Sequence, residues 1–493
     1  MSKAKLSWRK TACALFLIYA AAAIASPGQT FKTLANLDGT NGTQPLAAVV
    51  QGTDGNLYGT TDTGGANYAA GTIFRMTPAG ILTTFYNFCS QANCTDGSNP
   101  YAGLALGTDG NLYGTTLASG AYNGGTVFKI TRTGALTTLY SFCAQSGCAD
   151  GSQPMGGLVL GTDGNFYGTT AYGGNGSACP AGIGGCGTAF KITPAGTLTT
   201  LYNFCSQTNC ADGDGPESAL ALGTDGNFYG PTLFGGSDIT NAGTVFKLTP
   251  KGELKTLYTF CGQSPCTDGE SPWGGLVLAK SGNFYGTTYS GGANNGYEAG
   301  TVFKISPGGT FTPVYSFCAQ TGCTDGGNPR AGLALGADGN LYGVTEVNGG
   351  PEGVGTAFRI TPGGALTTLH SFDGTDGAYP EGGLFQATNG GFYGTTGGGG
   401  PYGAGTVFNL GVGLHPFIET VPAAGKVGQR VLILGNNLTG STSVTFNGIS
   451  ATFTVSSRTL ITATVPVGAT SGNVQVTTPS GTLTSNAPFR VLP

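Results

Sequence analysis

One phrase of the sequence returns seven times at nearly regular intervals. It first reads Asp54-Gly-Asn-Leu-Tyr58-Gly, and its tyrosine recurs at Tyr113, Tyr167, Tyr229, Tyr285, Tyr342 and Tyr393. The intervals between successive tyrosines run from 51 to 62 residues. A period near 50 residues is typical of a propeller or a solenoid, in which every copy forms the same structural unit.

Each copy contains four short apolar runs separated by turn signals. In the second copy they occupy residues 103–107, 112–116, 125–131 and 136–142. Runs rich in Thr, Val, Tyr and Phe between Gly, Asp and Pro are typical of strands. Four antiparallel strands in each copy predict one propeller blade. The 91 glycines of the 493 residues suit such a chain, because tight turns need positive φ.

The two ends of the repeat array complement each other. The seventh copy stops after its third run, at residues 405–411, and a run like the missing fourth one precedes the first copy at residues 31–37. The loops 37–42 and 372–377 also match closely. We therefore predict an all-β, seven-bladed β-propeller whose N-terminal strand closes the last blade. An open solenoid would not need this split blade, and closure removes free sheet edges.

Three phrases of the repeat carry a family resemblance. They read Asp-Gly-Asn-(Leu/Phe)-Tyr-Gly-Thr-Thr, Gly-Thr-Val-Phe-Lys-Ile-Thr-Pro and Leu-Thr-Thr-Leu-Tyr-Ser-Phe. Over about residues 30–412 the chain resembles the GloVer-type tandem repeats of secreted bacterial choice-of-anchor proteins. The resemblance implies export and surface display, and it brings no established biochemical activity. We assign residues 26–412 to the propeller.

The repeat ends near His415, and a different pattern of short strands follows. Apolar runs with turn signals between them lie at residues 431–438, 444–448, 461–466, 472–477 and 489–491. Strands at such spacing predict an Ig-like β-sandwich. The order of these runs resembles an IPT/TIG domain over residues 415–493, which implies a binding or spacer module.

The N-terminus has the layout of a secretory signal peptide. Four basic residues come before an apolar run at residues 11–25, which ends in Ala-Ile-Ala. We predict cleavage after residue 25; the alternative, a membrane anchor, needs about 20 apolar residues. Cleavage removes four of the 20 Lys and Arg and none of the 24 Asp and Glu, which leaves a net charge of −8. This acidic balance argues against nucleic acid as a partner. We expect no membrane insertion of the mature chain and a location that is extracellular, on the cell surface or periplasmic.

Twelve cysteines remain after cleavage, in six close pairs. An even number of cysteines in an exported chain predicts disulfides. Zinc is the alternative, but it usually needs four converging ligands, and the chain has only two histidines. The pairs are Cys89/Cys94, Cys143/Cys148, Cys179/Cys186, Cys205/Cys210, Cys261/Cys266 and Cys318/Cys323.

The candidate binding residues follow a proline that begins the inner strand of every copy. The residue after this proline differs each time, so the backbone does not dictate the side chain. In a propeller this position rings the mouth of the central channel, where such groups would suit a sugar or a peptide. The alternative is a solvated rim without a ligand. The seven residues are Leu46, Tyr101, Met155, Glu217, Trp273, Arg330 and Glu381.

Two further features belong to the loops on the same face. The loops between second and third strands carry the aromatic residues Tyr68, Tyr122, Tyr172, Phe234, Tyr289, Tyr297 and Tyr402. Each blade-to-blade loop has an Asp or Asn before Gly, and a ring of such oxygens would suit Ca²⁺, although Asp-Gly is more often turn chemistry. The positions are Asn41, Asp96, Asp150, Asp212, Asp268, Asp325 and Asp376. We otherwise expect no cofactor.

These features favour a non-enzymatic surface or secreted protein that recognises a carbohydrate or protein ligand through the loop face. One alternative is a carbohydrate-active propeller enzyme, a glycosidase or lyase. Glu217 and Glu381 are its only candidate carboxylates at the mouth, and they belong to the fourth and seventh copies, a wide spacing for a catalytic pair. The other alternative is a purely structural surface protein.

Overall fold

The computed structural model describes residues 29–67, 69–179, 185–236, 241–262, 265–294 and 299–493. The predicted signal peptide, residues 1–25, lies outside these ranges. Strands dominate the described residues, and the helical elements among them are four short 3₁₀ turns: η1 (Ala92–Cys94), η2 (Ser146–Cys148), η3 (Thr208–Cys210) and η4 (Thr321–Cys323). No helix within these ranges is long and apolar enough to cross a membrane.

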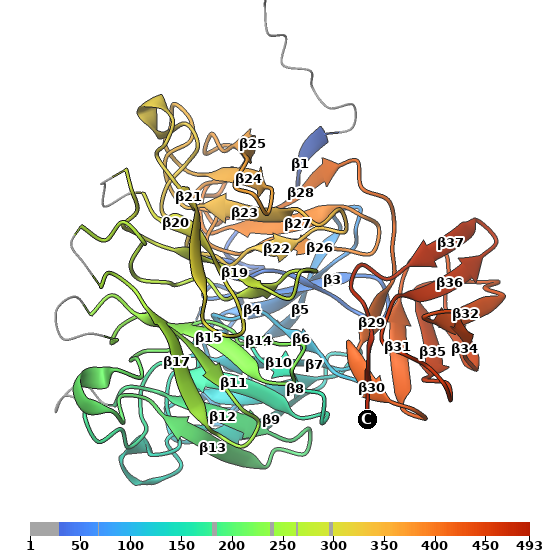
Figure 1. The fold of residues 1–493 in the computed structure, drawn as a ribbon, viewed down its shortest axis with the longest axis horizontal. Coiled ribbons are helices and arrows are strands. Elements are labelled where there is room, and N and C mark those ends of the chain that lie inside the picture. Colours follow the sequence, from blue (N-terminus) through green and yellow to red (C-terminus); the bar gives the residue numbers. More distant parts are fainter. Residues whose placement is uncertain (1–28, 68, 180–184, 237–240, 263–264, 295–298) are drawn as a thin grey trace, which may run out of the picture.

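Seven four-stranded antiparallel sheets form the blades of a propeller (Figure 1). The innermost strands are β2 (Val50–Gln51), β6 (Ala105–Leu106), β10 (Val159–Leu160), β14 (Ala221–Leu222), β18 (Val277–Leu278), β22 (Ala334–Leu335) and β26 (Phe385–Gln386). The second strands are β3 (Leu57–Thr61), β7 (Leu112–Thr116), β11 (Phe166–Thr170), β15 (Phe228–Thr232), β19 (Phe284–Thr288), β23 (Leu341–Thr345) and β27 (Phe392–Thr396). The third strands are β4 (Thr72–Met76), β8 (Thr126–Ile130), β12 (Thr188–Ile192), β16 (Thr244–Leu248), β20 (Thr301–Ile305), β24 (Thr356–Ile360) and β28 (Thr406–Val412). The outer strands are β5 (Leu82–Asn87), β9 (Leu136–Ser141), β13 (Leu198–Asn203), β17 (Leu254–Thr259), β21 (Phe311–Ser316), β25 (Leu366–Ser371) and, for the seventh blade, β1 (Gln29–Asn36).

The N-terminal strand completes the seventh blade, which confirms the predicted closure. β1 pairs antiparallel with β28, and the ring centroids of Phe31 and Phe408 lie 5.4 Å apart. The His370 ring stacks on Phe31 from the sixth blade, at 3.5 Å between centroids. The closing strand is therefore held by backbone pairing on one side and by ring packing on the other.

The blades follow one another in a ring, and the seventh lies beside the first. In every blade, the glycine before the third strand lies close to the proline that begins the next blade. If this glycine carried a Cβ atom, that atom would be only 2.6–2.8 Å from the Cδ atom of the proline. The same contact joins Gly405 of the last blade to Pro45 of the first. Thr395 Oγ1 of the seventh blade also donates a hydrogen bond to the Ala47 carbonyl oxygen of the first, at 3.1 Å.

The repeated phrase folds into a turn and strand because its residues bond to one another. In the second copy, Asp109 accepts hydrogen bonds from the backbone N–H of Asn111, from its side-chain amide and from the Tyr113 hydroxyl. Gly114 pairs with Phe128 on the third strand, and a Cβ on this glycine would lie 2.6 Å from the Phe128 ring. The glycine is thus required by the ring that packs across it.

The C-terminal residues form an Ig-like sandwich of two four-stranded sheets. One sheet has the order β29-β31-β35-β34, the other β33-β32-β36-β37, and β30 pairs with β38 in parallel. Apolar side chains that alternate along the strands, such as Val431, Ile433 and Phe446, fill the space between the sheets. The strands are β29 (Glu419–Val421), β30 (Ala424–Lys426), β31 (Arg430–Leu434), β32 (Ser443–Phe446), β33 (Ile449–Ser450), β34 (Phe453–Ser457), β35 (Leu460–Thr464), β36 (Val474–Thr478), β37 (Gly481–Thr484) and β38 (Arg490–Leu492).

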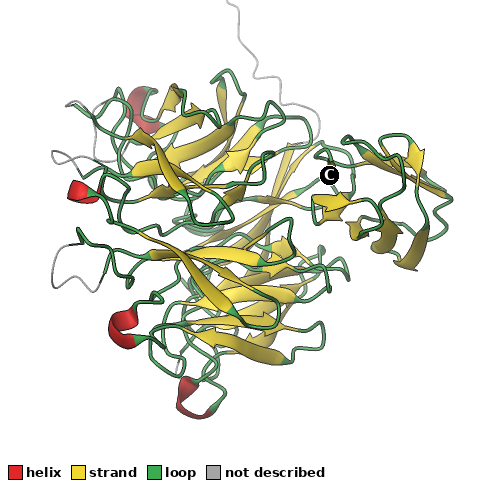
Figure 2. Ribbon diagram, turned by 60° about the horizontal axis from the view of Figure 1, so that its bottom comes forward, coloured by secondary structure: helices red, strands yellow, loops and turns green. Residues whose placement is uncertain are grey.

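The Ig-like domain packs on the face of the propeller that carries the short Asp-Gly-Asn turns. Thr459 Oγ1 donates to the Thr53 carbonyl oxygen at 2.9 Å, and Asn436 Nδ2 donates to Thr388 Oγ1 at 2.8 Å. Both propeller residues lie within such turns, which connect the first and second strands of their blades. The 3₁₀ turns of the cysteine loops lie on the other side of the disc, away from this domain (Figures 1 and 2).

Candidate ligand-binding site at the mouth of the central channel

Residues from all seven blades surround one cavity of about 390 Å³ at the start of the inner strands. In each blade the residue two positions before the mouth residue has a left-handed backbone, with φ between 50° and 61°, and a proline follows it. The same local turn therefore directs seven different side chains to the opening. All seven predicted mouth residues line this cavity: Leu46, Tyr101, Met155, Glu217, Trp273, Arg330 and Glu381.

Arg330 organises one side of the mouth. Its Nη1 lies 2.5 Å from Glu381 Oε2, its Nη2 donates to the Tyr101 hydroxyl at 2.9 Å, and its guanidinium lies 4.3 Å from the centroid of the Trp273 ring. Tyr289 meets Trp273 edge to face at 5.6 Å. An ion pair, a hydrogen bond and a cation–π contact thus hold four of these side chains in one arrangement before any ligand arrives.

Glu217 lines the same cavity without an ion-pair partner among the described residues. Burial raises the pKa of Glu217 to about 7, and burial likewise raises the pKa of the neighbouring Asp214 to about 6. Burial also raises the pKa of Glu381, although Arg330 opposes this shift. The mouth is therefore lined by one carboxyl group whose pKa burial raises to about 7 and by another that is held in a salt bridge.

A second layer of variable residues lies behind the mouth, and Tyr289 is its only member among the residues predicted from the sequence. It consists of the residue that follows each second strand. The backbone N–H of this residue donates a hydrogen bond to the carbonyl oxygen of the left-handed residue that precedes the proline of the same copy. In the sixth copy, for example, the Glu346 N–H donates to the Asn328 carbonyl oxygen. Burial raises the pKa of both Asp62 and Glu346 in this layer. A sequence signal was present, because this position also varies among copies: Asp62, Leu117, Ala171, Leu233, Tyr289, Glu346 and Gly397.

Below the mouth the channel narrows to a ring of small residues, two positions further along each inner segment. A Cβ on Gly332 would lie 2.6 Å from the Gly275 carbonyl oxygen of the preceding blade. The inner strand of the second copy is Ala105–Leu106 and not the predicted 103–107, since Gly103 belongs to this ring and Gly107 begins the turn to the second strand. The ring consists of Ala48, Gly103, Gly157, Ala219, Gly275, Gly332 and Gly383.

The segment Glu419–Ala424 covers the other end of the channel. It encloses a second cavity of about 320 Å³ together with the inner strands of the first four blades, including Val50, Ala105 and Val159. Burial raises the pKa of Glu419, at the floor of the channel, to about 7. The Ig-like domain thus covers the lower end of the channel beside these blades, and the mouth lies at the opposite end of the inner strands.

Several aromatic residues of the second-to-third loops are exposed. Tyr172 and Phe234 lie two residues after their second strands, close to the mouth, and are 40% and 41% exposed. Tyr122 and Tyr402 are more exposed still. Tyr68 and Tyr297 lie outside the described residues. A further exposed aromatic ring belongs to Tyr379, which directly precedes Pro380 and was not among the predicted aromatic residues of the loop face.

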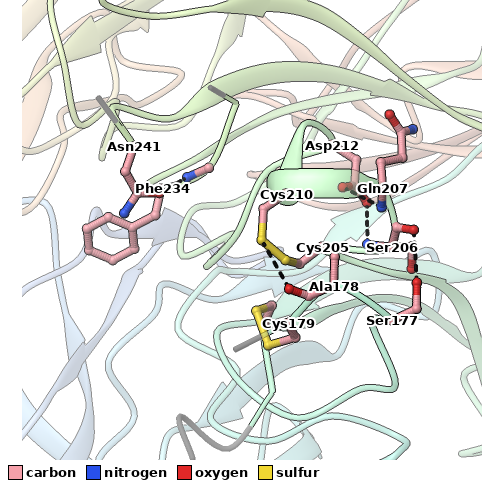
Figure 3. The surroundings of a disulfide bond; sticks show 12 residues. Ser177, Ala178, Cys179, Cys205, Ser206, Gln207, Cys210, Asp212, Phe234 and Asn241 are labelled. Carbon is pink, nitrogen blue, oxygen red and sulfur yellow. Dashed lines mark hydrogen bonds between the residues drawn. A yellow bond between two sulfur atoms is a disulfide. The ribbon is translucent and has the colours of Figure 1, made fainter. Parts of the chain in front are cut away.

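All six cysteine pairs lie at disulfide distance, with their Cα atoms 4.0–5.8 Å apart. Figure 3 shows how two of them meet: the loop of Cys179 runs beside the Cys205–Cys210 loop, where the Ala178 N–H donates to the Cys205 carbonyl at 2.9 Å. Ser177 donates to the Ser206 carbonyl in the same contact. The pairs therefore stiffen the variable loops of the mouth face.

The aspartates proposed as calcium ligands each serve their own loop. Asp212 accepts hydrogen bonds from the Tyr202 hydroxyl and from the N–H groups of Ser206 and Gln207 (Figure 3). Asp96, Asp150 and Asp325 repeat this pattern, Asp268 bonds to Tyr258 and the Cys261 N–H, and Asp376 bonds to His370. Within the described ranges none of them joins a cluster of three potential ligands. Calcium at these positions remains an untested prediction.

Comparisons with solved structures agree with the propeller. A fungal alcohol oxidase of the AA5 family, in complex with copper, superimposes with a TM-score of 0.53 at 12% identity, covering 95% of this chain and 100% of that one. A putative glucose dehydrogenase from Thermus thermophilus gives a TM-score of 0.40 at 17% identity, covering 78% of this chain and 99% of that one. At such identities the likeness of the oxidase concerns the fold alone. No curated protein matches the sequence.

Family models account for almost the whole described chain. The model of the Gloeobacter/Verrucomicrobia repeat matches residues 21–221 and 176–408, and the IPT/TIG model matches residues 416–491. These ranges coincide with the seven blades and with the sandwich. The chain therefore belongs to the Gloeobacter/Verrucomicrobia repeat family and ends in an IPT/TIG domain.

Proposed function

We propose that this protein is an exported surface or secreted binding protein that holds part of a carbohydrate at the mouth of its propeller. The observation that carries the proposal is the convergence of seven unlike side chains on one cavity, from a backbone turn that is the same in every blade. A scaffold alone does not require Trp, Arg and two Glu at equivalent positions. The repeat and the Ig-like domain suggest a surface protein, and the disulfide-distance pairs are consistent with export.

The chemistry of the mouth favours a carbohydrate over a peptide. Trp273 and Tyr101 offer flat apolar surface, and Glu217 and Glu381 offer acceptors for hydroxyl groups. Peptides that bind by adding a strand need an exposed sheet edge. The mouth offers side chains instead, since the inner strands begin only below it.

Binding to an array of immobilised saccharides and peptides tests the proposal directly. We expect the mature protein to bind saccharides, and Trp273→Ala to weaken the binding at least about tenfold, because truncating a central aromatic hot-spot residue typically costs about 2 kcal/mol or more. Ile81→Ala, which removes an exposed apolar side chain from a turn on the opposite face of the disc, is the control and should bind normally. Saccharide binding that survives Trp273→Ala would refute the mouth as the site. Binding to peptides alone would refute the carbohydrate.

One observation favours a second candidate function, glycoside cleavage. Glu217 has a pKa raised by burial to about 7, whereas Glu381 is salt-bridged to Arg330, so one cavity is lined by two carboxyl groups in unlike environments, which is how glycosidases divide the acid and carboxylate roles. Turnover of a polysaccharide by the wild type, lost in Glu217→Gln, would establish this function. Saccharide binding without release of reducing ends over a day would exclude it.

A further inference from the structure

The charges at the mouth are unbalanced. Glu217 and Glu381 line the cavity, and three more carboxyl groups adjoin it: Asp62, Asp214 and Glu346. Burial is the largest influence on the pKa of all five, and it raises each of them. The ion pairs found among the described residues include only one that serves this group, between Arg330 and Glu381. Of these five acids, only Glu381 has an ion-pair partner among the described residues.

The positive charge of Arg330 is already offset within the mouth. Its Nη1 pairs with Glu381, its Nη2 donates to the Tyr101 hydroxyl, and the guanidinium lies over the Trp273 ring. An anionic ligand would therefore meet the remaining carboxyl groups without a free cation to offset them. A neutral ligand would leave the local charge as it is.

Polar atoms without partners also gather here. Six buried side-chain N or O atoms of the described residues have no hydrogen-bond partner, and three of them lie at the mouth: Asp62 Oδ1, Ser218 Oγ and Glu346 Oε2. Ser218 lines the cavity, and the two acids stand behind it. Buried acceptors that lack donors are costly, and the two carboxyl oxygens behind the cavity add a negative potential there, which favours a positively charged ligand.

We propose that the mouth cavity takes a saccharide that bears a free, protonated amino group, with its ammonium beside Glu217 and its ring against Trp273. This inference rests on the proposed carbohydrate-binding function and adds the charge of the ligand. Glu217 is the natural partner because it faces the cavity and has no cation of its own among the described residues. An ammonium group supplies three donors and the missing positive charge.

The test is isothermal titration calorimetry at pH 6, where an amino sugar is already protonated, with three β-1,4-linked trisaccharides of equal length: glucosamine, N-acetylglucosamine and glucose. We expect the glucosamine trimer to bind at least about tenfold more tightly than the other two, since a hydrogen bond to a charged group contributes more than a neutral one. Binding of this trimer should also release protons, because its charge favours ionised Glu217. Repeating the titration in buffers of different ionisation enthalpy measures that release.

Two variants locate the effect. Glu217→Gln should remove the preference for the amine and most of the proton release, whereas Glu352→Gln, an exposed glutamate in a second-to-third loop of the mouth face, should keep both. Equal binding of all three trimers, abolished by Trp273→Ala, would overturn the amine and leave the carbohydrate site intact. Absence of binding by every saccharide would overturn the proposed function itself. Binding of trilysine as tight as that of the glucosamine trimer would show that charge alone is recognised and would overturn the sugar.

Discussion

At the scale of single residues, the mouth and the repeated phrase behave in opposite ways. Asp109 and Tyr113 bond to each other within one copy, so the fold itself requires them. Glu217 makes no such bond, and its burial is unfavourable for its charged form. A carboxyl group whose charged form is destabilised by burial indicates that the residue has a functional role and not a role in folding.

This burial predicts a pH-dependent cost in stability. Glu217 has a pKa of about 7 when folded and an ordinary value of 4.5, with Arg330, Asp214 and Tyr101 as the groups that act on it. Between these values the unfolded chain loses its proton first, so stability falls as pH rises, and the full cost is present above pH 7. We expect Glu217→Gln to raise the free energy of unfolding by about 1–2 kcal/mol at pH 8 and to leave it unchanged at pH 4.

Urea unfolding at the two pH values measures the effect. Glu352→Gln, at an exposed position, should change neither value. An increase that is equal at pH 4 and pH 8 would contradict the burial of a charge as its cause.

At the scale of elements, the segments that lead into the inner strands lie so close together that there is little room for side chains between their backbones. Gly332 lies where a Cβ would come within 2.6 Å of a carbonyl oxygen of the preceding blade. We expect Gly332→Ala to destabilise the protein by about 1–3 kcal/mol, the usual cost of overpacking. Gly363, in an outer turn where the nearest atom is a side-chain oxygen 3.8 Å away, provides the control, and Gly363→Ala should be tolerated. Thermal unfolding compares the two variants. Equal melting temperatures would contradict the close approach of neighbouring backbones at the ring of small residues.

The closing strand is the other element whose removal has a clear consequence. Without β1, the backbone of β28 would become a free sheet edge, and Phe408 and His370 would lose the Phe31 ring. We expect deletion of residues 26–36 to lower the melting temperature and promote aggregation. A synthetic peptide of residues 29–37, added in excess, should restore part of the melting temperature by binding the vacant edge. A truncated protein as stable as the wild type would contradict closure by this strand.

At the scale of the whole molecule, the two domains divide the faces of the disc between them. The Ig-like domain contacts the turn face through Thr459, which is 4% exposed and bonds to Thr53, while the mouth and the disulfide loops lie opposite. Ligand binding and domain packing thus use separate surfaces.

This division predicts that the domain contact can be broken without losing the site. Thr459→Arg places a long charged side chain against Gly55, whose Cβ position is 2.7 Å from the Thr459 methyl group. We expect the variant to show a larger radius of gyration in solution scattering and two separate unfolding transitions, while saccharide binding is unchanged. Thr454→Arg, at an exposed position of β34, should resemble the wild type in every measurement. An unchanged radius for Thr459→Arg would contradict the contact.

The seven blades, the split last blade and the seven mouth residues could all be predicted from the amino-acid sequence. The repeat makes this possible, because residues that the backbone requires are the same in every copy, whereas positions such as Glu217 and Trp273 differ between copies. The contacts of Arg330 with Glu381, Tyr101 and Trp273, the place of Asp62 and Glu346 behind them, and the packing of the Ig-like domain on the turn face became known only from the structure. These contacts join residues from different blades or domains, and the distances between such residues are set by the geometry of the closed ring, which no local pattern encodes.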